Sequence, residues 1–169
     1  MSITKFNDQN NSLVLFELAD NLDFLIKLYN LEKLPKILML TGKKGIGKFT
    51  LINHFLNYVY DKDNYDLINR TIKENTSFYK EYTNNIFENI IYLDGSNFKN
   101  IKVDDIRDLK SKILKTTISK KERFIVLDDI EQFNTNSLNA LLKIIEEPTL
   151  KNYFILINNK TKSLPDTLY

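Results

Sequence analysis

The chain is 169 residues long and 43% of them are hydrophobic, so it is about the size of one domain with its own core. Its 24 basic and 22 acidic residues leave a net charge of +2, so overall charge gives little attraction for nucleic acid. Cysteine is absent and His54 is the single histidine, which excludes disulfides, a thiol nucleophile and a cysteine- or histidine-rich metal site.

The first half of the chain is predicted to form a helix, a strand, a glycine loop and a second helix. Residues 1–11 are polar without a signal-peptide core, and no apolar run approaches the roughly 18 residues of a membrane-spanning helix. We therefore expect a cytoplasmic protein with no membrane partner. Helical spacing of apolar side chains predicts a helix over residues 13–31, and the apolar run over residues 37–40 predicts a strand. The second helix would bury one stripe and carry His54 as a partly exposed structural residue. The stripe consists of Ile52, Phe55, Leu56 and Val59.

Three of the four glycines fall within six residues, between the predicted strand and the second helix. Glycine lets backbone N–H groups converge on an anion without a Cβ in the way, and a helix N-terminus adds positive charge there. The spacing Gly42-x4-Gly47-Lys48 therefore predicts a P-loop (Walker A motif) that cradles phosphate, with a simple glycine turn as the less favoured alternative. The predicted nucleotide-binding residues are Gly42, Lys43, Lys44, Gly45, Ile46, Gly47, Lys48, Phe49 and Thr50.

One position of the loop departs from the motif. A P-loop carries Ser or Thr after its lysine, where the hydroxyl ligates Mg²⁺, and this chain carries Phe49. Thr50 does not replace that hydroxyl, because the next residue of a helix is rotated by about 100°. Thr50 matches the second hydroxyl of Gly-Lys-Thr-Thr loops and could still touch a phosphate. We expect nucleotide binding to tolerate this change better than hydrolysis does.

The second half of the chain alternates strands with helices. Residues 61–85 are polar, with scattered aromatics and no strong period. Beyond them, strands are predicted over residues 89–94, 124–127 and 153–157, and helices over residues 103–115 and 136–147. Because the strands are apolar on both faces, we expect a parallel sheet covered on two sides.

Two acidic residues end the strand predicted over residues 124–127. In a Walker B element, Asp128 would hold Mg²⁺ through water and Asp129 would position the attacking water. Hydrolysing members of that class usually carry Glu at the second position, and a carboxylate withdrawn by about 1.5 Å costs on the order of a hundredfold in rate. Asn158, at the end of the last strand, would lie next to Asp128 as a γ-phosphate sensor (sensor 1), or would only cap the strand. A strand-end turn with solvated carboxylates is the alternative for the two aspartates.

Three segments resemble one family. Residues 139–148, Asn-Ala-Leu-Leu-Lys-Ile-Ile-Glu-Glu-Pro, are similar to the Asn-Ala-Leu-Leu-Lys-x-Leu-Glu-Glu-Pro helix of bacterial DNA polymerase III clamp-loader subunits, an AAA+ family. Residues 103–109 resemble the family's Val-x-x-Ile-Arg-x-Leu helix, and residues 153–168 resemble its Phe-x-Leu-x-Thr-x5-Leu-Pro-x-Thr-Ile segment. The resemblance implies an α/β, three-layer P-loop NTPase domain of the RecA-like type over residues 1–169, with a parallel five-stranded sheet. It implies ATP or ADP with Mg²⁺ as ligands, bound weakly if at all.

The departures at Phe49 and Asp129 are similar to the delta-prime branch of this family, whose nucleotide site is commonly degenerate. That resemblance implies partnership with the delta and gamma/tau subunits, and through them with the sliding clamp and primer-template DNA. It also implies a part in a DNA-directed DNA polymerase holoenzyme and little or no ATP hydrolysis. The family's four-cysteine zinc module would fall in residues 61–85, where no cysteine remains, so no zinc is expected. Because the family continues with Ser-Arg-Cys, we expect a truncated chain without the lid and collar domains.

Two alternatives stay open. One is a catalytically active subunit of the gamma/tau type, or another AAA+ ATPase, in which Asp129 serves as the base. The other is a P-loop kinase, which is less favoured because such enzymes need an arginine-rich lid and this chain has three arginines, none clustered.

Overall fold

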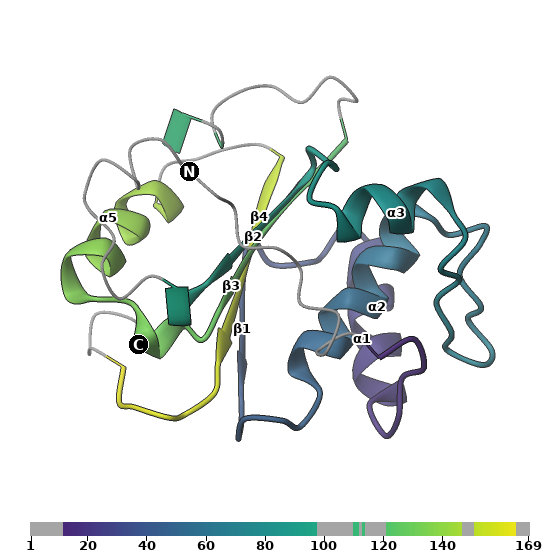
Figure 1. Ribbon diagram of the computed structural model, residues 1–169, viewed down its shortest axis with the longest axis horizontal. Helices are drawn as coiled ribbons and strands as arrows, with labels where there is room; N and C mark the ends of the chain where they lie inside the picture. Colours follow the sequence, from purple (N-terminus) through teal and green to yellow (C-terminus); the bar gives the residue numbers. More distant parts are fainter. Residues whose placement is uncertain (1–11, 98–109, 112, 114–120, 147–150, 165–169) are drawn as a thin grey trace. The chain divides into compact units, whose positions relative to one another are not determined.

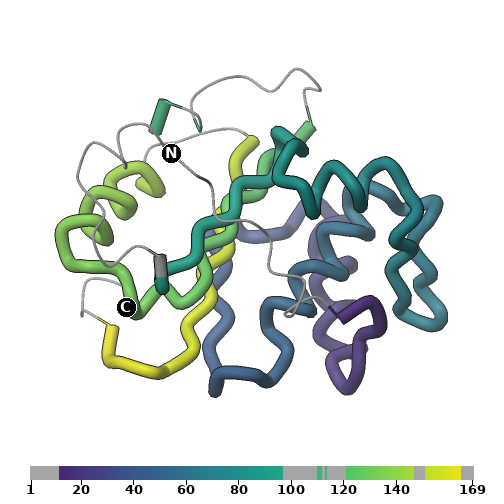
Figure 2. The backbone as a smooth tube through the Cα atoms, viewed as in Figure 1, coloured from purple at the N-terminus to yellow at the C-terminus, as the bar shows by residue number. Residues whose placement is uncertain are grey.

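The computed structural model describes residues 12–97, 110–111, 113, 121–146 and 151–164, which fall into two compact units. The first unit contains Lys36–Lys44 and the described residues from Glu88 onward. The second contains the described residues up to Pro35, together with residues 45–87. Figure 2 traces the chain as it passes into the first unit after Pro35, returns to the second at Gly45 and leaves it after Phe87. The P-loop sequence is therefore divided between the units, and the single domain over residues 1–169 stays a prediction.

The first unit is built on a parallel sheet (Figure 1). Its strands are β1 (Ile37–Thr41), β2 (Ile90–Asp94), β3 (Arg123–Asp128) and β4 (Asn152–Asn158), in the order β1-β4-β3-β2. β3 and β4 lie in the middle and are buried on both faces, as central strands of a parallel sheet are. The α/β class and the parallel sheet are confirmed, and each strand lies within one residue of its predicted bounds. The described residues contain four strands, where five were expected, and the three-layer arrangement stays a prediction.

Helix α5 (Thr135–Ile145) packs on this sheet within the first unit. Its first turn is capped by Asn134, whose side-chain oxygen accepts a hydrogen bond from the Ser137 N–H at 2.8 Å. Three apolar residues at helical spacing enter the core, and full burial of each contributes about 1.5–3 kcal/mol. They are Leu138, Leu141 and Ile144. The helix predicted over residues 136–147 is confirmed to within two residues.

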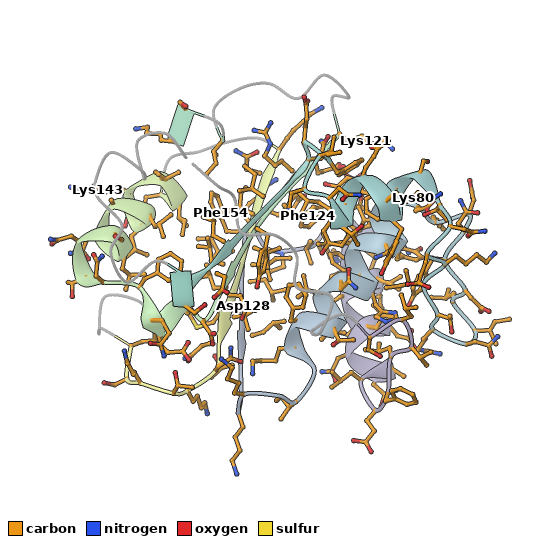
Figure 3. The ribbon with its side chains drawn as sticks, in the orientation of Figure 1. Lys80, Lys121, Phe124, Asp128, Lys143 and Phe154 are labelled. Carbon is orange, nitrogen blue, oxygen red and sulfur yellow. The ribbon has the colours of Figure 1, made fainter. Side chains whose placement is uncertain are left out.

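The helix predicted over residues 103–115 lies outside the described residues, except for residues 110, 111 and 113, which are helical. Figure 3 shows Phe124 and Phe154 on the two central strands and Asp128 at the carboxyl end of β3. Because both phenylalanines are buried near the start of their strands, the apolar core reaches the amino-terminal half of the sheet. Polar groups gather at the opposite, carboxyl edge.

The second unit contains helices α1 (Ala19–Asn30), α2 (Lys48–Tyr60) and α3 (Ser77–Thr83). α1 begins later than the predicted residue 13, because the segment before it pairs with a distant one. The Leu15 N–H donates to the Arg70 carbonyl oxygen at 3.1 Å, and Val14 forms an isolated bridge with Thr71. The prediction that this helix begins at residue 13 is therefore wrong.

Among the described residues, no helix has the length and apolar character that crossing a bilayer requires.

His54 lies on α2 as predicted but is fully buried rather than partly exposed. Its Nε2 lies 3.0 Å from the Ser12 carbonyl oxygen and its Nδ1 lies 2.9 Å from the Tyr65 hydroxyl. A carbonyl oxygen only accepts, so Nε2 carries the proton and Nδ1 accepts from Tyr65. Burial lowers the pKa of His54 to about 4, which keeps the ring neutral at pH 7.

Residues 61–85, for which the sequence predicted no helix or strand, are organised around aromatic rings. Thr76 caps α3 by accepting a hydrogen bond from the Tyr79 N–H at 3.1 Å. Phe78 stacks on Tyr82, with ring centroids 5.6 Å apart, and meets the edge of Phe87 at 4.9 Å. This aromatic cluster gives the segment an apolar core of its own.

Candidate functional site

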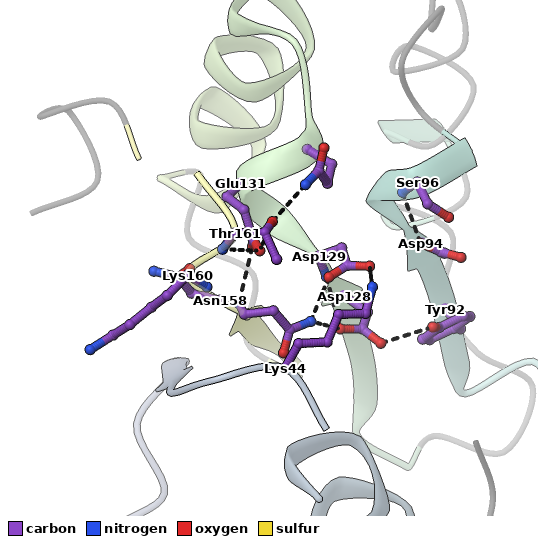
Figure 4. Close-up of polar contacts among 12 residues, drawn as sticks. Lys44, Tyr92, Asp94, Ser96, Asp128, Asp129, Glu131, Asn158, Lys160 and Thr161 are labelled. Atoms are coloured by element: carbon purple, nitrogen blue, oxygen red, sulfur yellow. Dashed lines mark hydrogen bonds and ion pairs between the residues drawn. The ribbon is translucent and has the colours of Figure 1, made fainter. Parts of the chain in front are cut away.

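The carboxyl ends of the strands bring polar side chains to one edge of the sheet in the first unit (Figure 4). The strand register pairs Asp94 with Asp128 and Thr41 with Asn158. β1 continues into Gly42–Lys44, the first residues of the P-loop sequence. In open parallel sheets, ligands bind at this edge. The topology therefore brings the start of the P-loop sequence to the same edge as Asp128 and Asp129, the two aspartates for which the sequence predicted a Walker B role.

Asp128 is buried, and its carboxylate has three hydrogen-bond donors. Oδ1 accepts from the Asp129 N–H at 2.8 Å and from the Asn159 side-chain amide at 3.3 Å. Oδ2 accepts from the Tyr92 hydroxyl at 3.1 Å. Burial raises the pKa of Asp128, and the charges of Asp129 and Asp94 add to this effect, while two of the hydrogen bonds oppose it.

Asp129 directly follows β3 and turns the chain. Its φ of 48° and ψ of 45° lie in the left-handed region, which costs a non-glycine residue about 1 kcal/mol. Oδ1 accepts a hydrogen bond of 2.5 Å from the Asn159 side-chain amide, and Oδ2 pairs with the Lys44 ammonium at 3.0 Å. Both carboxylate oxygens at the base position are thus engaged by other side chains. The hydrogen bond to Asp129 is the main reason that the pKa of Lys44 is raised.

Gly95 marks the closest backbone approach at this edge. A Cβ built on it would lie 2.2 Å from the Asp129 carbonyl oxygen, closer than any real Cβ contact. Glycine is therefore needed here for space, so that the turn after β2 can meet the turn after β3.

Asn158 does not provide the amide that meets Asp128, although the sequence predicted that it would lie next to it. Its side-chain oxygen accepts from the Lys160 N–H at 2.9 Å, and its carbonyl oxygen accepts from the Gly42 N–H at 3.2 Å. The amide that contacts both aspartates belongs to the next residue, Asn159. Asn158 instead ties the start of the P-loop sequence to the end of β4, and a sensor role for it stays a prediction.

Glu131 holds the loop that carries Asn159. The glutamate is buried, and its carboxylate accepts from the Asn159 N–H at 3.1 Å and from the Thr161 N–H at 3.2 Å. It also accepts from the Thr161 hydroxyl at 2.8 Å. Hydrogen bonds to a charged acceptor are the strong ones. Glu131 therefore fixes the backbone from which the Asn159 amide reaches the aspartates.

The second half of the P-loop sequence belongs to the second unit. Gly45 and Gly47 have φ values of 87° and 86°, a conformation that glycine adopts without strain. Gly47 is the N-cap of α2, and Lys48 is the first helical residue. The predicted order of strand, glycine loop and helix is present. Phe49 and Thr50 follow in the first turn of α2, both partly buried, while Ile46 is 51% exposed.

Sequence reasoning missed Asn159 and Glu131. The only signals for them are the paired asparagines at the end of β4 and an acidic residue two positions after Asp129. Neither signal is specific, because both contacts join loops about 30 residues apart in the chain.

Residues 19–169 match the protein family described as DNA polymerase III, delta subunit. The chain is similar to DNA polymerase III subunit delta' of Buchnera aphidicola subsp. Schizaphis graminum, 39% identical over 66 residues, which cover 39% of this chain and 20% of that protein. The subunit delta' of Pseudomonas aeruginosa is 34% identical over 70 residues, which cover 41% of this chain and 21% of that protein. The gamma subunit of the same Buchnera is 27% identical over 143 residues, covering 83% and 37%. The chain thus spans less than two fifths of the length of each relative.

The solved structure of C. elegans PCH-2 superposes with a TM-score of 0.48 and 16% identity, covering 95% of this chain and 44% of that one. The family match covers most of the chain, and the relatives named above are DNA polymerase III subunits of two kinds, delta' and gamma. The predicted resemblance is confirmed at the level of the family. The chain belongs to the DNA polymerase III delta-subunit family of clamp-loader proteins.

Proposed function

We propose that this chain acts as a delta-prime-type clamp-loader subunit that hydrolyses ATP too slowly to drive the clamp-loading cycle. In this role it helps the delta and gamma/tau subunits load the sliding clamp on primed DNA in the bacterial cytoplasm. ATP or ADP would bind weakly at the P-loop sequence.

One observation carries the proposal. Asp129 stands where hydrolysing relatives carry the acid that positions water, and each of its two oxygens already has a partner in the chain, Asn159 at 2.5 Å and Lys44 at 3.0 Å, which leaves fewer acceptor sites for water. A base must have an oxygen within hydrogen-bond reach of the attacking water. The shorter aspartate and the Phe49 side chain act in the same direction, since each removes part of the hydrolytic geometry.

A working motor of the gamma/tau type is the second candidate. The similarity to the Buchnera gamma subunit extends over 83% of the chain, whereas that to the Buchnera delta' subunit extends over 39%, at higher identity. In that case Asp129 would be released when nucleotide binds and would serve as the base.

Steady-state ATP hydrolysis with Mg²⁺ separates the two candidates, with Lys48→Ala as the control. Our proposal predicts turnover no higher than that of the control. Clear turnover that Lys48→Ala abolishes would overturn it in favour of the motor. Phe49→Thr combined with Asp129→Glu should restore more hydrolysis than either change alone if the missing groups are the cause.

Co-purification tests the partnership itself. The chain, co-expressed with the delta and gamma/tau subunits of its own clamp loader, should be retained with them on a tag carried by one of those subunits. The Asp129→Asn variant serves as a matched control, because a role that does not use hydrolysis should leave retention unchanged. Loss of retention in the Asp129→Asn variant would contradict this expectation, and failure of the unaltered chain to be retained would count against the partnership.

A further inference from the structure

The residues at the sheet edge do not fit the Mg²⁺ ion that a P-loop site implies. Mg²⁺ in such sites takes oxygen ligands, one of them the hydroxyl after the P-loop lysine, where this chain has Phe49. P-loop sites hold Mg²⁺ through one or two protein oxygens together with phosphate and water, so the loss of that hydroxyl removes a direct protein ligand. The carboxylates at this edge are spaced for hydrogen bonds to protein groups.

A cation of the protein itself stands among those carboxylates. The Lys44 ammonium lies 3.0 Å from Asp129 Oδ2. The charges of Asp129, Asp128 and Asp94 all raise the pKa of Lys44, after the hydrogen bond to Asp129 as the largest cause. Lys44 is therefore charged at pH 7, and it neutralises part of the acidic edge as a bound cation would.

From this geometry we infer that Lys44 takes the place of a divalent cation beside Asp129, so that the acidic edge binds Mg²⁺ more weakly while Lys44 is present. The Lys44 ammonium and a metal ion at this edge would compete for Asp129 Oδ2, and their like charges would repel each other. This inference rests on the proposed function only in taking this edge as the nucleotide site.

The experiment measures Mn²⁺, a paramagnetic substitute for Mg²⁺ with the same preference for oxygen ligands, in the absence of nucleotide. Free and bound Mn²⁺ are separated by electron paramagnetic resonance for the full chain and for Lys44→Met. Removing the ammonium should tighten Mn²⁺ binding by about three- to tenfold, because the Lys44 side chain is 65% exposed and solvent screens part of the repulsion between its charge and the metal ion. Adding Asp129→Asn to Lys44→Met should abolish the gain.

Lys160→Met is the matched control. It removes the same charge from the same edge of the sheet, but the Lys160 side chain is exposed and points away from the aspartates in Figure 4. Its Mn²⁺ affinity should stay within about twofold of the parent, since charges that are separated by solvent are largely screened.

Three outcomes overturn the inference. Tight Mn²⁺ binding by the unaltered chain would overturn it directly. An increase in Mn²⁺ affinity in Lys160→Met as large as that in Lys44→Met would overturn it as well. Failure of a folded Lys44→Met variant to bind more tightly shows that Lys44 is not what weakens metal binding. Each of these leaves the subunit assignment standing, whereas Lys48-dependent ATP turnover would overturn the assignment whatever the Mn²⁺ result.

Discussion

The buried Glu131 carboxylate allows a stability effect to be worked out contact by contact. Glu131→Ala removes the acceptor of three hydrogen bonds, from the Asn159 N–H, the Thr161 N–H and the Thr161 hydroxyl. Asn159 is buried, so its N–H loses an acceptor that water does not replace, at about 2 kcal/mol. Thr161 is exposed and regains water, so its two bonds together contribute about 1 kcal/mol. We expect the free energy of unfolding to fall by about 3 kcal/mol.

Urea denaturation followed by circular dichroism measures this change. Glu131→Gln should lose about half as much, because its amide oxygen still accepts while its NH₂ group faces a donor. Glu146→Ala, which removes an exposed carboxylate at the end of α5, should change the free energy by less than about 0.5 kcal/mol. A Glu131→Ala variant as stable as the Glu146→Ala variant would refute the claim that Glu131 holds the loop after β4.

Three further predictions concern stability. Gly95→Ala puts a Cβ 2.2 Å from the Asp129 carbonyl oxygen, so it should lower the free energy of unfolding by about 2 kcal/mol and the melting temperature by about 4–8 °C. His54 titrates near pH 6.5 when unfolded but has a pKa of about 4 when folded. The unfolded chain therefore binds more protons between these values, and urea titrations should show a loss of up to about 3 kcal/mol as the pH falls from 7 to 4. Phe78→Ala empties the centre of the aromatic cluster and should cost about 3–4 kcal/mol in the same assay.

Each of these has its own control. Ser96→Ala, an exposed change next to Gly95, should be neutral to within about 0.5 kcal/mol, and a neutral Gly95→Ala would contradict the close approach. His54→Gln should remove the pH dependence between pH 4 and 6.5 that the histidine causes, whatever its effect on stability at pH 7. Phe24→Ala, at a ring that is 61% exposed, should cost far less than Phe78→Ala, and equal losses would argue against an aromatic core.

The parts of the fold that the sequence predicted are those that local pattern determines. Continuous apolar runs mark the central strands because those strands are buried on both faces. Glycine spacing marks the loop between β1 and α2 because two of its residues, Gly45 and Gly47, have positive φ, which other residues rarely adopt. Helix α5 follows from its Asn134 cap and its apolar spacing, both of which are local.

The failures share a physical cause, which is pairing between segments distant in the chain. The first helix begins later than predicted because the Leu15 N–H bonds to the carbonyl oxygen of Arg70, which lies 55 residues further along the chain. His54 was expected to be partly exposed, and it is buried because Ser12 and Tyr65 supply both of its hydrogen-bond partners. None of these distant partners is marked by a periodic sequence pattern near the residue that it contacts.

The same distinction between local pattern and distant contacts bears on the proposed loss of hydrolysis at the sheet edge. A motif comparison scores Asp129 only as one methylene shorter than Glu, which suggests that lengthening it would restore the base. In the structure, Asp129 is the middle of a chain of contacts that runs from Lys44 through Asn159 to Glu131. In Asp129→Glu the longer acid would still lie beside an ammonium and beside an amide fixed by a buried carboxylate, so any restored hydrolysis should stay below that of a hydrolysing relative. Under the proposed function, hydrolysis therefore depends on freeing this carboxylate from its contacts with Lys44 and Asn159 as well as on lengthening it.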